Sequence, residues 1–226
     1  MGNLINSYIF SGAGWDFEDT DMEQSWSLQN NTITSNKMNC NGRAFTSTVY
    51  YGNIDPMGAA ASNTAWVLWA TINFSELTKG SLGGNSQLVC LSDNATSASS
   101  TNQDGIGTWA NYDFGGAGTK RWLAKACDGS RFEPNGGYQQ FGTATLETGV
   151  DYYLQMIRLS ATTCNCGIYS NYDRSTLIEA ETPSVASTVT NLRYIKMVNL
   201  TGFNGGADML STVNGVNFAD GVTTAP

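Results

Sequence analysis

The stretch Asp151–Ser170 places apolar side chains at every second position in two arms that are joined by a short polar turn. A period of two puts alternate side chains on opposite faces of a sheet. The stretch therefore predicts a β-hairpin with one face toward a core and the other toward solvent or a second layer. The residues of the core parity are Tyr152, Leu154, Met156, Cys164, Cys166 and Ile168.

A second segment, Thr64–Phe74, is the strongest strand candidate in the chain. Its middle is apolar on both faces, because Leu68 and Ala70 alternate with Val67 and Trp69. Such a pattern predicts a central strand. Roughly a dozen short strand candidates separated by turn signals predict an all-β chain folded as an antiparallel β-sandwich of jelly-roll type.

The domain organisation follows from the absence of repeats and of linker-like shifts in composition. The 226 residues fit one large all-β domain. We expect an N-terminal arm over residues 1–14, a single sandwich domain over residues 15–220 and a C-terminal tail over residues 221–226.

Charge and histidine content exclude several classes of function. The net charge of −8 leaves no basic footprint, which argues against nucleic-acid partners and against anionic membrane surfaces. No segment is long enough to span a membrane. The chain contains no histidine, so Ser-His-Asp and Cys-His catalysis and most catalytic zinc sites are ruled out.

The cysteines read as structural. Their number is odd, and Cys164 and Cys166 lie two apart on one predicted strand, where they cannot easily bond each other. The Cys-x-Cys pair lacks a second pair at ligand spacing, so no metal site is predicted. A bridge between Cys90 and Cys127 stays open. The five cysteines are Cys40, Cys90, Cys127, Cys164 and Cys166.

The first 14 residues have no basic region and no long apolar run, so they do not predict a secretory signal. The composition, however, is typical of an extracellular protein. Removal of a signal, another export route, or release with a virion on lysis would each reconcile these observations. We expect an extracellular or virion-surface location.

Nine segments carry a resemblance to a known family: Ala65–Leu68, Thr71–Thr78, Leu91–Asn94, Gln103–Gly107, Ala124–Gly129, Tyr152–Thr162, Ile168–Ser170, Leu192–Lys196 and Val213–Thr223. Together they resemble the concanavalin A-like lectin/glucanase superfamily, with its laminin-G-like jelly rolls. The resemblance implies a concanavalin A-like antiparallel β-sandwich and, for many such domains, glycan binding on surfaces of cells, environmental microbes and phages. The matching positions are mostly core and turn residues, so they specify fold better than function.

Two departures from the family matter. Retaining glucanases of this fold carry a Glu-x-Asp-x-x-Glu strand, and here the nearest match, Glu179-Ala-Glu181, lacks the central Asp. We therefore expect no enzyme activity. Asn214 and Asn217 stand where laminin-G-like relatives often have acidic residues, which weakens an inherited calcium site.

Calcium near Asp19 or Asp21 stays open. No metal or other cofactor is assigned.

A sugar site needs an aromatic platform and short polar groups. The region from Asp104 to Tyr138 offers both. The competing interpretation places Trp109 and Trp122 in the core, whereas Tyr112 and Tyr138 border turns. The predicted ligand-binding residues are Asp104, Trp109, Asn111, Tyr112, Trp122 and Tyr138.

Three functions remain on the sequence alone: a lectin-like module, a purely structural decoration or fibre subunit, and a glycoside hydrolase or lyase, which the missing motif disfavours. We expect a non-enzymatic, lectin-like, adhesive surface module with carbohydrate as its partner, displayed on a virion or another extracellular assembly. Self-association, or contact with a capsid or fibre through residues 1–14, stays open.

Overall fold

The computed structural model describes residues 14–16, 33–34, 37–41, 48–53, 60–78, 84–94, 103–112, 120–130, 139–199 and 208–223. Within these ranges every regular element is a strand, which confirms the predicted all-β class. A search of the same ranges for a helix long and apolar enough to cross a membrane finds none. In chain order the strands are β1 (Gly14–Asp16), β2 (Ile33–Thr34), β3 (Lys37–Asn41), β4 (Thr48–Asn53), β5 (Trp66–Thr78), β6 (Gly84–Ser92), β7 (Gln103–Tyr112), β8 (Lys120–Ser130), β9 (Gln139–Thr145), β10 (Asp151–Ser160), β11 (Thr163–Tyr169), β12 (Leu177–Glu181), β13 (Tyr194–Asn199) and β14 (Asp208–Asp220).

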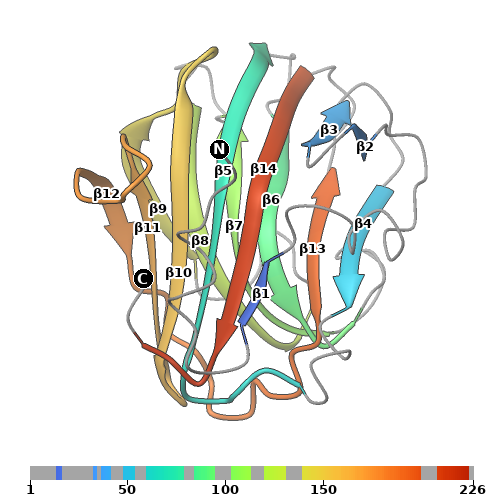
Figure 1. The fold of residues 1–226 in the computed structure, drawn as a ribbon, viewed down its shortest axis with the longest axis vertical. Coiled ribbons are helices and arrows are strands. Elements are labelled where there is room, and N and C mark those ends of the chain that lie inside the picture. The colour runs from blue at the N-terminus through green and yellow to red at the C-terminus, as the bar shows by residue number, and fades with distance from the viewer. Residues whose placement is uncertain are drawn as a thin grey trace.

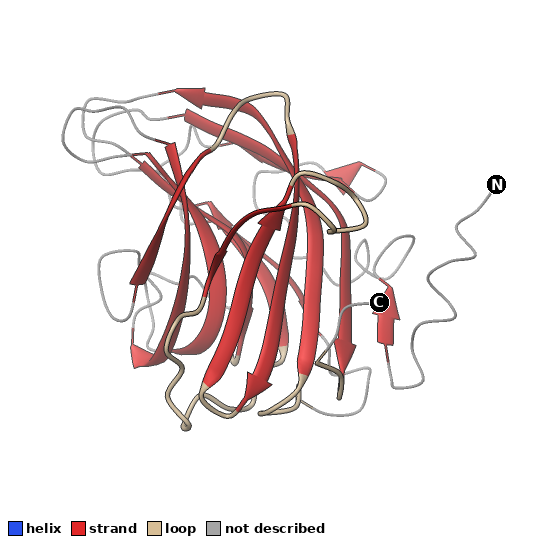
Figure 2. Cartoon of the chain, turned by 90° about the vertical axis from the view of Figure 1, so that its left-hand side faces the viewer, coloured by secondary structure: helices blue, strands red, loops and turns tan. Residues whose placement is uncertain are grey.

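The strands form two antiparallel sheets that pack as layers. The eight-stranded sheet has the order β12-β11-β10-β5-β14-β3-β2, with β1 paired to β14. The six-stranded sheet has the order β4-β13-β6-β7-β8-β9. Figure 1 shows the first sheet in front of the second, and Figure 2 shows the two layers from the side. This arrangement confirms the predicted antiparallel sandwich.

Strand β5 is central, as its two apolar faces predict. It pairs with β10 on one side and β14 on the other, so that Leu68 lies opposite both Met156 and Phe218. Leu68 and Ala70 belong to the core between the sheets. Val67 and Trp69 are buried on the opposite face with Ala219. Burial on both faces explains why the segment carries no polar side chain near its middle.

The predicted hairpin is β10–β11. Its register sets Met156 opposite Cys166 and Arg158 opposite Cys164. Both cysteines are fully buried in the core, which confirms that they are structural. Arg158 is also buried, and burial lowers its pKa.

The Arg158 side chain is held by backbone carbonyls at the end of the hairpin. Nε donates to the carbonyl of Ser160 at 2.7 Å, and Nη2 donates to the carbonyls of Ala161 and Val189. These bonds replace part of the hydration that the guanidinium loses. The core face of the hairpin is therefore scaffold.

The two ends of the chain are described only in part. Residues 1–13 of the predicted arm lie outside the described residues, and Gly14–Asp16 pair with Asn217–Ala219 of β14. Residues 224–226 of the predicted tail also lie outside them, as do Asp19 and Asp21.

The open question of a Cys90–Cys127 bridge is answered by strand order. Both residues are buried thiols, and β7 lies between their strands β6 and β8. Second-neighbour strands are about 9–10 Å apart, which is beyond the reach of a disulfide.

Candidate functional site

The predicted site residues on β7 and β8 divide between the two faces of the six-stranded sheet. Trp122 lies opposite Ala110, and both belong to the core between the sheets. Trp109 lies opposite Leu123, one position along each strand, so alternation turns these two side chains to the outer face. The two tryptophans cannot form one binding platform.

The outer face of the six-stranded sheet is buried around Trp109, although Arg121 near its end is partly exposed. Trp109, Leu123 and Lys125 are each 0% exposed. Gly107 lies between Cys90 and Lys125 in register, and a Cβ at Gly107 would come within 2.3 Å of the Cys90 Cβ. Trp109 is therefore packed into this face and offers no accessible ring to a ligand.

Asp104 braces three segments of chain. Its Oδ1 accepts a hydrogen bond from the Gly129 N–H at 2.8 Å, and its Oδ2 accepts one from the Thr190 N–H at 3.2 Å. Its own N–H donates to Asp93 Oδ1 at 2.9 Å. Both carboxylate oxygens are thus occupied by the backbone, which gives Asp104 a structural role in this state.

The remaining predicted residues cannot be placed as side chains. Asn111 and Tyr112 form the last two positions of β7, where they pair with Arg121 and Lys120. Their side chains lie outside the described residues, and Tyr138 does so entirely. Of the six predicted ligand-binding residues, the structure therefore places the side chains of Asp104, Trp109 and Trp122 only, and it does not bring the two tryptophans together.

An accessible aromatic site occurs instead on the outer face of the eight-stranded sheet. It consists of Tyr153, Tyr169, Tyr172 and Arg174, which we call the tyrosine–arginine cluster. Register across β10 and β11 sets Tyr153 opposite Tyr169, whose neighbour on β12 is the exposed Leu177. Tyr153 and Tyr169 belong to the outward parity of the hairpin, opposite to its core residues.

The β11–β12 loop (residues 170–176) carries the other half of the cluster. The loop is closed by a bond from the Ser170 N–H to the Thr176 carbonyl at 3.0 Å. Inside it, Asn171 Oδ1 accepts from the Thr176 N–H at 2.9 Å, and Asn171 Nδ2 donates to Ser175 Oγ at 2.7 Å. Turn-forming polar side chains thus give this loop a defined conformation.

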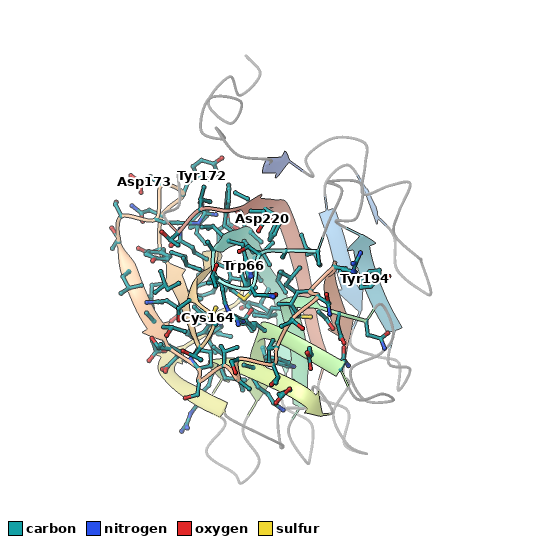
Figure 3. The ribbon with its side chains drawn as sticks, turned by 90° about the horizontal axis from the view of Figure 1, so that it is seen from below. Trp66, Cys164, Tyr172, Asp173, Tyr194 and Asp220 are labelled. Atoms are coloured by element: carbon teal, nitrogen blue, oxygen red, sulfur yellow. The ribbon has the colours of Figure 1, made fainter. Side chains whose placement is uncertain are left out.

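Tyr172 is the most accessible member. Its side chain is 59% exposed, and its ring meets that of Tyr153 edge to face, with centroids 5.9 Å apart and an interplanar angle of 87°. Figure 3 shows Tyr172 and Asp173 at the periphery, whereas Trp66 and Cys164 lie between the layers. The Tyr153 contact fixes an exposed ring that would otherwise be free to rotate.

Arg174 lies partly buried among the tyrosines. It adopts a left-handed conformation with φ of 54°. Nε donates to the Leu154 carbonyl at 3.3 Å, and Nη1 donates to the Tyr172 carbonyl at 3.1 Å. Desolvation lowers the pKa of Arg174 to about 10. The group therefore stays charged at neutral pH.

Tyr169 forms the floor of the cluster. Its ring lies over Gly167, where a Cβ would come within 3.0 Å of the ring. Its hydroxyl donates to Gln155 Oε1 at 3.1 Å, and Gln155 is itself buried. Burial raises the pKa of the Tyr169 phenol, against the opposing charge of Arg174. This hydrogen bond fixes the ring that supports the more exposed members.

Glu179 and Glu181 lie at the edge where β12 meets β9. Glu179 Oε2 accepts from the Ala144 N–H at 2.9 Å, so it ties the two sheets together. Glu181 is buried, and desolvation, with a smaller effect from Glu179, raises its pKa. In the described part of the chain, no group of three or more His, Cys, Asp or Glu could hold a metal ion.

Sequence reasoning missed the tyrosine–arginine cluster. A signal was present, because Tyr172 stands between Asn171 and Asp173 in a polar turn directly after the hairpin. An aromatic residue inside a run of turn-forming residues is exposed more often than one flanked by strand residues. The outward parity of Tyr153 and Tyr169 pointed to the same face.

Comparisons with known proteins bear on the fold. No protein-family model matches the sequence, and a search of curated proteins finds no match. Among solved structures, the chain is similar to a legume lectin-like domain from Entamoeba histolytica, with a TM-score of 0.58 and 13% identity over 88% of this chain and 91% of that one.

Two further structures show the same likeness. One is the CBM2 module of the Dit protein of Lactobacillus casei BL23 phage J-1, with a TM-score of 0.55, 10% identity, and coverage of 88% of this chain and 82% of that one. The other is an alginate lyase, Aly36B, with a TM-score of 0.51, 11% identity, and coverage of 89% and 87%. At these identities the likeness establishes architecture alone. The chain has the concanavalin A-like, jelly-roll sandwich fold that these lectin-like and carbohydrate-acting domains share.

Proposed function

We propose that this chain is a non-enzymatic, glycan-binding surface module, displayed on a virion or another extracellular assembly, and that it contacts glycans through the tyrosine–arginine cluster. The observation that carries the proposal is the exposed Tyr172 ring, held edge-on by Tyr153 beside a charged Arg174. An aromatic face with convergent polar groups suits a sugar ring, which has apolar C–H faces and a rim of hydroxyls.

Preorganisation supports the same proposal. The β11–β12 loop is closed by its own hydrogen bonds, so a ligand would not have to order it. The fold adds weight, because the similar structures include a legume lectin-like domain and a phage CBM2 module. The phage origin of the latter fits display on a virion.

A glycan array, followed by titration of the best ligand, tests this proposal. We expect binding by the native chain and a loss of affinity of about fivefold or more in Tyr172→Ala, because truncating a central tyrosine typically costs about 1 kcal/mol or more. Tyr112→Ala is the matched variant, since it removes the tyrosine that the sequence favours on the other sheet. Loss of binding in Tyr112→Ala but not in Tyr172→Ala would move the site to the six-stranded sheet.

An array without any signal, for protein that still unfolds cooperatively, would overturn glycan binding and leave the structural-subunit alternative. The non-enzymatic part has its own test on a panel of polysaccharides. Glu179 is bonded to the backbone of β9 and Glu181 is buried, so we expect no turnover. Turnover that Glu179→Gln or Glu181→Gln abolishes would contradict this part.

A further inference from the structure

Arg174 carries a positive charge that no carboxylate neutralises within the described ranges. Two of its three nitrogens donate to backbone carbonyls, Nε to Leu154 and Nη1 to Tyr172. These bonds fix the plane of the guanidinium. Nη2 donates to no group in the described part of the chain, and it is the nitrogen that a ligand could engage.

The neighbouring acid, Asp173, forms no ion pair with Arg174 within the described residues. Asp173 follows Tyr172 in the loop, but its Oδ1 accepts from the N–H and the hydroxyl of Ser175, at 3.2 and 3.0 Å. The groups that interact electrostatically with Arg174 are the phenols of Tyr172, Tyr169 and Tyr153, and no carboxylate is among them. Arg174 is therefore a partly desolvated cation in an aromatic setting.

Such a cation gains from an anionic partner. Removing a charge from water costs free energy, and pairing with a carboxylate recovers part of that cost. A guanidinium also matches a carboxylate through charge-assisted, directional hydrogen bonds. An aromatic ring, exposed Tyr172, lies beside this charge. A ligand that offers a stacking face and a carboxylate on one ring would use both.

We propose that the tyrosine–arginine cluster selects sugars that carry a carboxylate, as uronates and sialates do, with the sugar ring against Tyr172 and the carboxylate paired with Arg174. This inference rests on the proposed glycan-binding function and adds the chemical class of the ligand. The chain as a whole has a net charge of −8, so the preference would come from this local charge and not from long-range attraction.

The test compares probes that differ in the carboxylate alone. One pair is an oligogalacturonate and its carboxyl-reduced form, and the other is sialyllactose and lactose, so that the two pairs distinguish uronate from sialate. Titration calorimetry on the native chain should show at least one acidic probe binding about tenfold more tightly than its neutral counterpart. A ratio within about twofold for both pairs would overturn the inference.

Variants then assign the preference to Arg174. In Arg174→Gln the affinity for the acidic probe should fall to that for the neutral probe, while the affinity for the neutral probe is unchanged. Arg121→Gln, on β8 of the other sheet, is the matched control and should keep the ratio. Persistence of the ratio in Arg174→Gln would also overturn the inference.

Two further readouts keep the test decisive if Arg174→Gln disturbs the loop. Arg174→Lys keeps the positive charge but loses the planar guanidinium that can donate two parallel hydrogen bonds, so it should retain part of the preference for the acidic probe. For the native chain, raising NaCl from about 50 to about 500 mM should narrow the ratio by weakening the acidic probe alone. A ratio that salt does not change would argue against a charge pair.

Failure of the two proposals is distinguishable. If Tyr172→Ala loses neutral and acidic probes alike while the native ratio is near unity, glycan binding stands and the acidic preference falls. If no probe and no array glycan binds the native chain, glycan binding itself falls.

Discussion

The outer faces of the two sheets both carry aromatic side chains, yet they differ in what they present to solvent. On the six-stranded sheet, Trp109 is 0% exposed and packs beside Leu123 and Lys125, which are equally buried. On the eight-stranded sheet, Tyr172 is 59% exposed and stands on a loop above Tyr153. The comparison teaches that a large aromatic near glycines is not evidence of a binding platform. A ring becomes accessible when a self-supporting loop lifts it from the sheet.

The largest loss of stability is expected for Trp109→Ala on the outer face of the six-stranded sheet. Truncation of a buried tryptophan removes packing and leaves a cavity, which should lower the free energy of unfolding by about 3–5 kcal/mol. Thermal unfolding should then begin roughly 10 °C lower, while the folded fraction still binds glycan. A variant with native stability and no binding would show that the ring is accessible after all.

The next largest loss of stability is expected for Gly107→Ala. The new Cβ would stand 2.3 Å from the Cys90 Cβ and 3.0 Å from its Cα, so β6 and β7 would have to separate. Overpacking of this kind costs about 1–3 kcal/mol, measurable by urea unfolding.

Gly129→Ala is the matched control for that prediction. Gly129 has open space around its Cβ position but a φ of +53°, so only about 1 kcal/mol of backbone strain is expected. An equal loss in both variants would contradict the close approach at Gly107.

On the other face, Tyr169→Phe should cost about 1 kcal/mol, because it removes the donor to the buried Gln155 Oε1. Burial raises the pKa of Tyr169, so the phenol's contribution to stability is complete below the ordinary value near 10 and is lost as pH rises through the raised pKa. The free energies of unfolding of the native and variant chains, measured with urea, should therefore differ at about pH 8, and the difference should shrink as the pH rises above about 10. A gap that widens at high pH would refute this assignment.

The smallest effect on stability is expected for Tyr172→Ala, below about 0.5 kcal/mol, because the side chain is mostly exposed. The same variant should have the largest effect on glycan binding. Paired measurements of melting temperature and affinity for Trp109→Ala and Tyr172→Ala would therefore give opposite patterns. Matching patterns in the two variants would abolish the distinction between the faces.

Much of the fold could be predicted from local patterns in the sequence. The parity of Tyr152, Leu154 and Met156 gave the buried face of β10, and the apolar middle of Thr64–Phe74 gave a central strand, because alternation is a local property. Pairing is not local. The sequence near Trp109 and Trp122 does not reveal which face of the sheet each side chain occupies or how deeply that face is buried. Both depend on the pairing and packing of strands that are distant in the chain.

The site was harder to predict for the same reason. Tyr153 and Tyr172 meet because a polar loop folds back over the sheet, and Arg174 reaches the carbonyl of Leu154 from the next turn. Loop geometry of this kind depends on the hydrogen bonds of Asn171 and Ser175, which composition suggests but does not place. The predicted residues were aromatic and polar, as a sugar site requires, but the described tryptophans among them serve packing.

The buried thiols of the β10–β11 hairpin can serve as probes of how often the sandwich opens. Cys164 and Cys166 are 0% exposed, with sulfur atoms 4.0 Å apart, and the pKa of Cys166 is raised well above its ordinary value by the Cys164 contact and by burial. A maleimide can alkylate them only in molecules whose layers have parted, because neither thiol is accessible in the closed state and the raised pKa of Cys166 also disfavours its thiolate. The rate of maleimide labelling, followed by the mass of the peptide that carries both cysteines, would thus measure how often the sandwich opens at this hairpin in native buffer.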